Sequence, residues 1–216
     1  MSVMDSSNKK YVVVITGMHR SGTSAVSSLM QQFGFDYGKC LLNPTEYNQK
    51  GFFENRRIMQ FNDRLLDKLG MHWADPFTSL DISALQEDMF FRLKDELVEI
   101  FRQEFSEGSI IVIKDPRFCL LIPFWKLAFN ELKMSPLFLQ VIRHPEEVAL
   151  SLENRNNMAA GRAENLWIHY NLLAENHTRQ ERRKILIFND ILDNFEESGN
   201  SIIRFIQEKT GRPCLK

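Results

Sequence analysis

The sequence predicts an α/β fold in which helices cover both faces of a parallel sheet, and two observations carry this prediction. The first is a set of short, continuous apolar runs, which are typical of strands buried on both faces. The second is that segments with helical periodicity alternate with these runs along the chain. The expected strands are Val12–Thr16, Ile110–Ile113, Leu137–Ile142 and Ile185–Phe188.

Helices are expected between these strands and after the last one. In the second helix, Ile58, Phe61 and Leu65 repeat at the spacing of one helix face. Pro145 suits a first helical turn, because its missing N–H costs little there. The expected helices are Thr23–Phe33, Glu54–Leu69, Leu85–Phe105, Phe124–Lys133, Pro145–Arg155, Ala163–His177 and Ser201–Lys209. Residues 35–53 are expected to form a long loop, and loops of that length are commonly functional.

Length and composition limit the organisation of the chain and its partners. The 216 residues, 44% of them hydrophobic, are enough for one domain, which we expect to span residues 1–216. A formal charge of −1 argues against nucleic-acid binding through a general basic field. No signal peptide and no apolar run of membrane-spanning length is evident, so a cytoplasmic protein is expected. The three cysteines are widely spaced without a C-x-x-C pair, and they predict neither disulfides nor a metal site.

The segment VVVITGMHRSGTSAVSSLM at residues 12–30 places a glycine loop between a strand and a helix. This is the context of the phosphate-binding pattern G-x-x-x-x-G-K-[ST], in which backbone N–H groups and the helix dipole favour anionic oxygen. Thr23 stands at the lysine position, and the nearest cation is Arg20. The loop therefore predicts an anion site that differs from a standard ATP site.

A second constellation follows the third expected strand, in the segment VIRHPEEVALS. Arg143 ends the strand, and Ser151 comes eight residues later, about two turns into the next helix. The two side chains could meet a further anionic group at the same sheet edge. A surface arginine and an ordinary helical serine would give the same pattern.

Together the two elements resemble those of the sulfotransferase superfamily, whose donor is 3′-phosphoadenosine 5′-phosphosulfate (PAPS). The family's 5′-phosphosulfate loop reads [KR]-S-G-[TS]-[TS], and Arg20–Ser24 matches every position. Its 3′-phosphate element reads R-[NDH]-P-x-x-x-x-x-S, and Arg143–Ser151 has that spacing. The resemblance runs from about Tyr11 to Gly211. The segments GMHRSGTSA, GFFENRRI and IKDPRFCLLIPFW look most like small, glycan-associated bacterial members.

The resemblance implies a P-loop NTPase-like, three-layer fold and a transfer of sulfuryl from PAPS to a hydroxyl acceptor, a carbohydrate or another small molecule. The other product is adenosine 3′,5′-bisphosphate. Arg20 takes the role of the family's lysine, and Phe188 stands at the aromatic position that contacts adenine. The implied donor-binding residues are Arg20, Ser21, Gly22, Thr23, Ser24, Arg143, Ser151 and Phe188.

The sequence also departs from the family pattern in two places. The K-T-H-x-P segment, whose histidine is the base of cytosolic members, is replaced by Lys114–Arg117, with Pro116 at the histidine position. The family's late basic-glycine segment, which grips the donor, has no counterpart before Lys216. Glu54 is the best candidate for a replacement base, because some members use a glutamate from this region. A glutamate at a helix start also suits the helix dipole, so a purely structural role stays open.

Lys114 completes the expected catalytic set of Glu54, Lys114 and Arg20. It ends a strand near the loop and could stabilise charge on the leaving phosphate, or it could pair with Asp115 or another acid. Asp115 and His19 are the alternative bases. Arg117 suits either an acidic acceptor or a salt bridge, and Trp73 is the best aromatic candidate on the acceptor side.

Two other functions remain open from the sequence. A P-loop kinase using Mg-ATP would place an acid after the apolar strand, as Asp115 is placed here, but it would require a lysine at position 23. A binding protein of the same fold without activity is the third possibility. Binding of adenosine 3′,5′-bisphosphate without magnesium discriminates between the first two.

Overall fold

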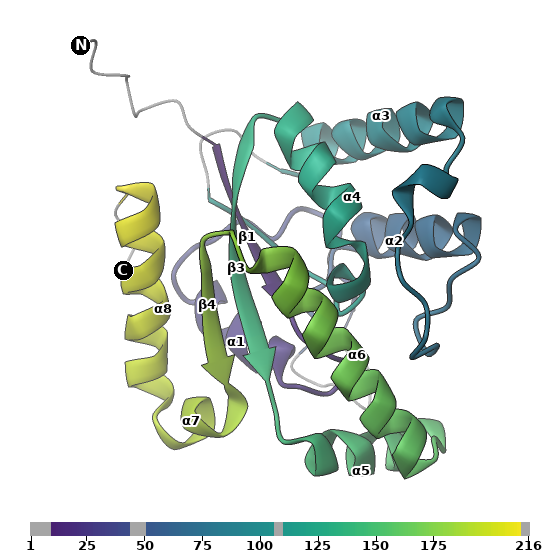
Figure 1. Ribbon diagram of the computed structural model, residues 1–216. Helices are drawn as coiled ribbons and strands as arrows, with labels where there is room; N and C mark the ends of the chain where they lie inside the picture. The colour runs from purple at the N-terminus through teal and green to yellow at the C-terminus, as the bar shows by residue number, and fades with distance from the viewer. Residues whose placement is uncertain (1–9, 44–50, 106–109, 213–216) are drawn as a thin grey trace.

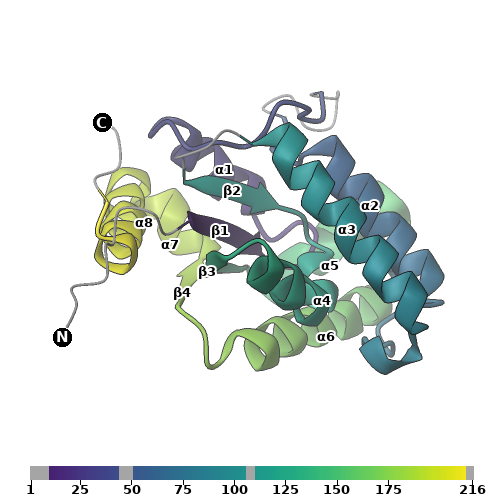
Figure 2. The ribbon, with the colours of Figure 1, turned by 90° about the horizontal axis from the view of Figure 1, so that it is seen from above.

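The computed structural model describes residues 10–43, 51–105 and 110–212. Its centre is a four-stranded parallel sheet in the order β2-β1-β3-β4, of which β1, β3 and β4 are labelled in Figure 1 and all four in Figure 2. The strands are β1 (Lys10–Thr16), β2 (Ile111–Lys114), β3 (Met134–Ile142) and β4 (Arg183–Ile187). All three strand pairings are parallel, and β1, the strand before the glycine loop, lies between β2 and β3.

Helices cover both faces of the sheet, which confirms the predicted fold class. The helices are α1 (Thr23–Gln31), α2 (Arg56–Lys68), α3 (Glu87–Glu104), α4 (Phe118–Glu131), α5 (Pro145–Asn156), α6 (Ala160–Thr178), α7 (Phe188–Asp193) and α8 (Phe195–Thr210). In the view along the sheet, α1 and α8 lie on one side, and α4 and α6 lie on the other (Figure 2). The helices α2 and α3 form a further layer outside α4 (Figure 2).

The alternation of side chains along β1 explains why both faces are covered. Val12 and Val14 belong to one apolar cluster, which takes in residues of α2, α3, α4 and α6. Val13 and Ile15 belong to the other cluster, with residues of α1 and α8. All four side chains are buried, as expected for a central parallel strand.

Several helices differ from the predicted bounds. The helix α2 begins at Arg56, because the side chain of Asn55 accepts hydrogen bonds from the N–H groups of Arg57 and Ile58 and caps the helix there. The prediction that Glu54 opens this helix is therefore wrong. The helix α4 begins six residues before the predicted Phe124 and continues through Pro123.

The end of the chain also differs from the prediction. The last strand ends at Ile187, and Phe188, which was expected to end it, starts the short helix α7. The helix α8 begins at Phe195, six residues before the predicted start. Asn194 links the two helices with a φ of −137° and a ψ of 60°, a break that no glycine or proline marks in the sequence.

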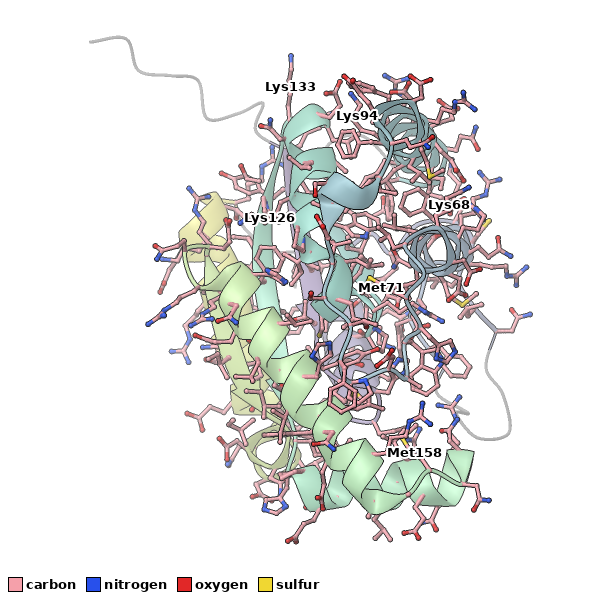
Figure 3. All side chains as sticks on the ribbon, turned by 45° about the vertical axis from the view of Figure 1, so that its right-hand side comes forward. Lys68, Met71, Lys94, Lys126, Lys133 and Met158 are labelled. Carbon is pink, nitrogen blue, oxygen red and sulfur yellow. The ribbon has the colours of Figure 1, made fainter. Side chains whose placement is uncertain are left out.

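The strands point toward the end of the molecule where α5 and α7 lie (Figure 1). In the side-chain view, Met158, just after α5, marks this end, and Lys133, just before β3, lies at the opposite end (Figure 3). The loops that carry the predicted site residues follow the carboxyl ends of the strands, where open α/β sheets bind ligands.

Some expectations concern features away from the sheet. No helix within residues 10–43, 51–105 and 110–212 is long and apolar enough to cross a membrane. Cys40 and Cys119 are free thiols, and Cys214 lies outside the described residues. Of the loop expected over residues 35–53, positions 44–50 also lie outside them.

Candidate active site

The glycine loop between β1 and α1 needs its glycines for steric reasons. Gly22 has a φ of 90°, and a Cβ atom there would lie 2.0 Å from the ring of Phe188. A Cβ atom on Gly17 would lie 2.6 Å from the carbonyl oxygen of Val141 in β3. Both distances are too short for any larger residue, so the glycines let the loop lie against β3 and α7.

The start of α1 has the character of an anion site. Gly22 is the N-cap residue, and no side chain caps the helix. The N–H groups of the first turn therefore keep their capacity to bind an anion, which the helix dipole also favours. Ser21 is fully buried, and its Oγ atom has no hydrogen-bond partner among the described residues. A buried hydroxyl without a partner is costly unless a ligand supplies one.

Arg20 and Ser151, predicted to bind opposite ends of one ligand, are in direct contact. The Nε atom of Arg20 donates to Ser151 Oγ at 2.7 Å, which joins the loop to α5. Arg143, at the carboxyl end of β3, donates from Nη1 to the carbonyl oxygen of Arg20 at 3.2 Å. Burial and the charges of Arg155 and Arg143 lower the pKa of Arg20. The predicted 3′-phosphate and 5′-phosphosulfate residues thus lie side by side.

Phe188 closes this side of the site. The guanidinium carbon of Arg143 lies 4.9 Å from the centre of the Phe188 ring, a cation–π distance. The same ring lies against Gly22. Arg143 also donates from Nε to Glu147 Oε2 at 2.6 Å, so one side of its guanidinium is already paired with a carboxylate.

Glu54 and Lys114, the predicted base and cation, form a buried ion pair. The Nζ atom of Lys114 donates to Glu54 Oε1 at 2.8 Å, to the carbonyl oxygen of Phe52 at 2.8 Å and to Ser24 Oγ at 3.2 Å. The side chains are only 3% and 11% exposed. Of the two pairings expected for Lys114, the structure has the one with a neighbouring acid, and Lys114 links that acid to the glycine loop.

Burial raises the pKa of Glu54, and the charge of Asp115 acts in the same direction, whereas Lys114 opposes it. A raised pKa favours a carboxylate that takes a proton near neutral pH. The backbone around Glu54 is fixed as well, because Leu42 donates to its carbonyl oxygen at 2.9 Å. Phe53, the preceding residue, has a φ of 54°, in the left-handed region that side chains rarely adopt.

Asp115 and Arg117 take structural roles next to the pair. Asp115 accepts hydrogen bonds from Asn62 Nδ2 at 2.9 Å and from Arg117 Nη1 at 3.0 Å. Arg117 also pairs through Nε with Asp63 Oδ1 at 2.8 Å. Trp125, in the core, donates from Nε1 to Asn62 Oδ1 at 2.9 Å. The four side chains thus form a continuous polar network with Trp125. Asp115 is therefore less available than Glu54 as a base.

His19, the other alternative base, lines the site as a neutral ring. Burial, together with the charges of Arg117, Lys114, Arg155 and Arg20, lowers its pKa to about 3. The residue keeps some solvent contact, but Nε2 is buried without a hydrogen-bond partner among the described residues. A histidine with so low a pKa is a poor general base, and its neutral ring is better suited to hydrogen bonding.

These groups surround a cavity of about 250 Å³. Its lining residues are His19, Arg20, Gly22, Thr23, Ser24, Phe52, Glu54, Lys114, Pro116, Arg143 and Arg155. Ser21, Ser151 and Phe188 do not line it, although Ser151 and Phe188 contact residues that do. Pro116, which stands where a histidine was expected from the family pattern, lies at this wall.

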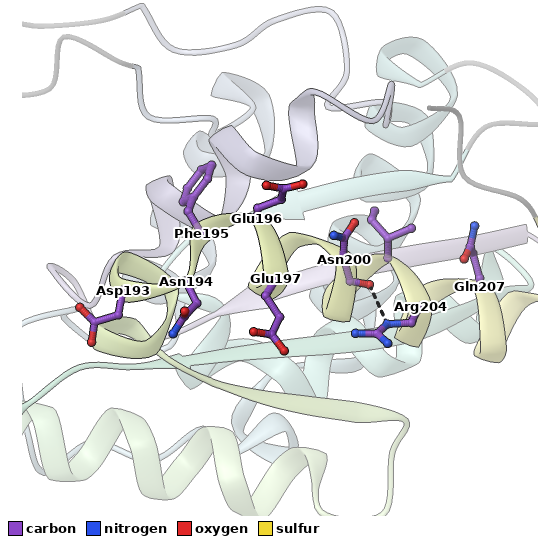
Figure 4. Close-up of a pocket in the computed structure, with 9 residues that line it drawn as sticks. Asp193, Asn194, Phe195, Glu196, Glu197, Asn200, Arg204 and Gln207 are labelled. Atoms are coloured by element: carbon purple, nitrogen blue, oxygen red, sulfur yellow. Dashed lines mark hydrogen bonds between the residues drawn. The ribbon is translucent and has the colours of Figure 1, made fainter.

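A larger and more open hollow of about 780 Å³ lies along α7 and α8 (Figure 4). Asp193, Glu196 and Glu197 line it, and Arg204 is the cation in its lining. Three carboxylates make it unsuited to an anionic ligand. Although it is larger, this hollow is therefore a poorer candidate for the binding site of an anionic ligand than the cavity at the glycine loop.

Two lining residues had no assigned role in the sequence. Arg155 follows Ser151 by four residues, so the helical spacing from the predicted serine would have found it. Phe52 contributes its backbone carbonyl, for which side-chain patterns give no signal.

No family model matches the sequence, and no curated protein matches it. Solved structures do match its fold. The sulfotransferase domain of the olefin synthase from Synechococcus PCC 7002 has 17% sequence identity at a TM-score of 0.57, with 95% of this chain and 74% of that chain covered. The sulfotransferase domain from the curacin biosynthetic pathway has 15% identity at a TM-score of 0.53, with 93% and 75% covered. The likeness shows that the chain has the fold of these domains.

Proposed function

We propose that this protein is a sulfotransferase that moves the sulfuryl group of PAPS to a hydroxyl acceptor, a carbohydrate or another small molecule. The observation that carries the proposal is the single cavity that joins an uncapped helix start, the cations Arg20, Lys114 and Arg143, and the carboxylate of Glu54. The fold of two sulfotransferase domains supports it. The proposal includes the single domain, the cytoplasmic location and the likeness to small, glycan-associated bacterial members expected from the sequence.

The residues present fit the donor. The 5′-phosphosulfate would be held by the loop residues Arg20, Ser21, Gly22, Thr23 and Ser24. The buried Ser21 hydroxyl, which has no partner among the described residues, supports this assignment. Arg143 and Ser151 would hold the 3′-phosphate, with Arg143 leaving Glu147 for the phosphate. Phe188, which lies beside Arg143, would contact adenine.

PAPS supplies a sulfur atom bound to a good leaving group. The acceptor hydroxyl forms a bond to this sulfur and gives its proton to Glu54, while the bond between sulfur and the bridging oxygen breaks and adenosine 3′,5′-bisphosphate leaves. Lys114, within reach of both Glu54 and Ser24, stabilises the negative charge that appears on the bridging oxygen. Proton removal and charge stabilisation thus come from neighbouring side chains.

The kinase alternative is less well supported at the atomic level. A magnesium site after β2 would use Asp115, but this carboxylate is engaged by Asn62 and Arg117. Thr23, at the position of the phosphate-binding lysine, has a neutral side chain.

Ligand-dependent thermal stability tests the proposal. Adenosine 3′,5′-bisphosphate without magnesium should raise the melting temperature, because a ligand that binds only the folded state stabilises it. Mg-ATP should have a smaller effect. A larger shift with Mg-ATP would overturn the proposal in favour of the kinase, and no shift with either nucleotide would favour a protein without donor binding. Turnover of labelled PAPS over a panel of sugars and phenols then identifies the acceptor.

A further inference from the structure

Part of the cavity lining lies outside the proposed donor residues. The donor residues contact one another, Phe188 with Arg143, Arg143 with Arg20, and Arg20 with Ser151. His19 contacts Trp73 instead, with ring centres 4.6 Å apart. Arg155 and His19 both line the cavity without an assignment to the donor, and the part that they line is called the His19–Arg155 end.

Arg155 differs from the other cations of the cavity in having no partner. Arg20 contacts Ser151, Arg143 pairs with Glu147, and Lys114 pairs with Glu54. Within residues 10–43, 51–105 and 110–212, the side chain of Arg155 makes no hydrogen bond, ion pair or ring contact. It lies one turn after Ser151 on α5, on the helix face that meets Arg20.

The charge of Arg155 acts on both His19 and Arg20, lowering the pKa of each. All three side chains line the same cavity. Arg117 and Lys114 act on His19 in the same way. The charged residues that line the cavity are the cations Arg20, Lys114, Arg143 and Arg155 and the acid Glu54. Asp115 and Asp63 of α2 are both paired with Arg117.

His19 supplies the second observation, a buried polar atom without a partner. Its Nε2 atom has no hydrogen-bond partner among the described residues. The ring is held in place by Trp73 and by Tyr170, whose ring centre lies 5.9 Å away. Tyr170 also donates from its hydroxyl to the carbonyl oxygen of Trp73 at 2.8 Å, so the wall that carries Trp73 is fixed to α6.

We propose that the His19–Arg155 end of the cavity binds the acceptor, and that the acceptor is a hydroxyl compound carrying an anionic group, either a carboxylate or a sulfate or phosphate ester. Arg155 pairs with the anionic group, and His19 Nε2 hydrogen-bonds to a hydroxyl. A neutral acceptor would cover the guanidinium without giving it a partner, which disfavours binding. The inference deepens the proposed function and rests on it.

Matched hexose probes test the inference without a known acceptor. Glucose, glucuronate and glucose 6-sulfate share their ring hydroxyls and differ at C6, and the last two separate a carboxylate from a sulfate ester. Binding is measured by calorimetry or ligand-observed NMR to protein saturated with adenosine 3′,5′-bisphosphate. At least one anionic probe should bind about tenfold or more tightly than glucose, as expected for a charged hydrogen-bond partner.

Variants assign this preference to residues. Arg155→Ala should remove the preference and should weaken binding of adenosine 3′,5′-bisphosphate less than Arg143→Ala does, and Arg155→Lys should restore part of the preference. His19→Phe, which keeps a ring against Trp73, should weaken all three probes equally. Arg102→Ala is the control, because Arg102 is an exposed arginine on α3, away from the cavity.

The outcomes separate the two proposals. A wild-type protein that does not bind adenosine 3′,5′-bisphosphate overturns the proposed function and this inference with it. A protein that binds the nucleotide but binds glucose as tightly as both anionic probes overturns only the inference. If Arg155→Ala weakens nucleotide binding as much as Arg143→Ala does and leaves the preference among the hexose probes unchanged, Arg155 belongs to the donor site and the acceptor assignment is wrong.

Discussion

Glu54 and Lys114 form an ion pair with each other, and this pairing suits the proposed reaction. Burial raises the pKa of Glu54, and the Lys114 ammonium limits this rise by favouring the ionised carboxylate, the form that can accept a proton. In the proposed reaction, Glu54 would attract Lys114 less once it is protonated, and Lys114 would be free for the oxygen that gains charge. The contact of Lys114 with Ser24 places it next to that oxygen's proposed position.

Glu54→Gln tests the base. Glutamine keeps the size of the side chain but cannot take a proton, so kcat should fall by about 10²–10⁴-fold while affinity for adenosine 3′,5′-bisphosphate is retained. In the wild type, the rate should fall as the pH drops below the raised pKa of Glu54, because the protonated carboxyl is inactive. The variant should lack this limb of the pH–rate profile. A variant with near-normal kcat would exclude Glu54 as the base.

The same variant leaves Lys114 buried without its counter-charge. Breaking a buried ion pair costs about 3–5 kcal/mol, so loss of stability must be separated from loss of chemistry. Urea unfolding of Glu54→Gln and of the double variant Glu54→Gln/Lys114→Met makes the separation. The double variant should recover part of the stability and none of the activity.

Arg143→Ala tests the 3′-phosphate assignment. In the wild type, adenosine 3′,5′-bisphosphate should bind more tightly than 5′-AMP, and the variant should lose about 10–100-fold of this preference. Calorimetry with both ligands measures the difference, and Ser151→Ala should reduce it in the same direction. Equal weakening of both ligands would mean that Arg143 acts only by holding the loop through the carbonyl oxygen of Arg20.

At the scale of elements, the segment that carries Glu54 is held from α3. Glu104, at the end of α3, accepts hydrogen bonds at Oε2 from the N–H groups of Lys39 and Cys40 and from Asn55 Nδ2. Cys40 in turn accepts from Arg56 N–H at 2.7 Å. Burial opposes ionisation of Glu104, but the hydrogen bonds from Asn55 and Cys40 outweigh it and lower the pKa. One buried carboxylate thus connects α3, the N-cap of α2 and the strand-like segment beside Glu54.

Glu104→Gln tests this connection. The change weakens charge-assisted hydrogen bonds, so the free energy of unfolding should fall by about 1.5–3 kcal/mol. kcat should also fall, because the backbone of Glu54 is fixed through this segment, whereas nucleotide affinity should be retained. Glu99→Gln, at an exposed position on the same helix, is the control for the loss of a carboxylate. Normal kcat in a destabilised Glu104→Gln protein would restrict Glu104 to a structural role.

The sequence predicted the central elements better than the connections between them. The four strands were found because continuous apolar runs signal burial on both faces. The start of α2 was placed too early, because the cap depends on which way the Asn55 side chain points. The helix α7 was missed, since its six residues are too few to show a helical period.

For the site, motifs located the residues, and only the fold showed how they combine. Arg20 and Ser151 are 131 positions apart in the sequence, and the parallel order of the strands brings them within 2.7 Å. Pairing of Lys114 with Glu54 rather than Asp115 depends on the connection after residue 50, which no pattern specifies. The sequence allowed His19 as a base, and its burial among cations is a property of the folded chain.

At the scale of the whole molecule, the carboxyl edge of the sheet gathers positive charge from four separate segments. Arg20 follows β1, Lys114 ends β2, Arg143 follows β3, and Arg155 lies in the last turn of α5. The cavity lining therefore has more cations than acids, although the chain as a whole has a formal charge of −1. Such a local excess of cations favours an anionic ligand without making the whole protein basic.

The burial of His19, together with these cations, predicts how the stability of the protein depends on pH. The pKa of His19 lies at about 3 in the folded protein, compared with an ordinary value of 6.5 in the unfolded chain. Below pH 6.5 the unfolded chain therefore binds a proton that the folded protein does not. The contribution is complete above pH 6.5 and is lost as the pH falls toward 3, by up to about 1.4 kcal/mol per pH unit.

His19→Phe removes this contribution and keeps a ring beside Trp73. Urea unfolding from pH 7 to pH 4.5 should give a smaller loss of stability for the variant than for the wild type, with the difference growing as the pH falls. Carboxylates that titrate in the same range contribute equally to both proteins and cancel in the comparison. Equal pH dependence in the two proteins would mean that His19 takes up a proton in the folded state. The ring would then carry a charge, and the neutral hydrogen-bonding role assigned to it would be wrong.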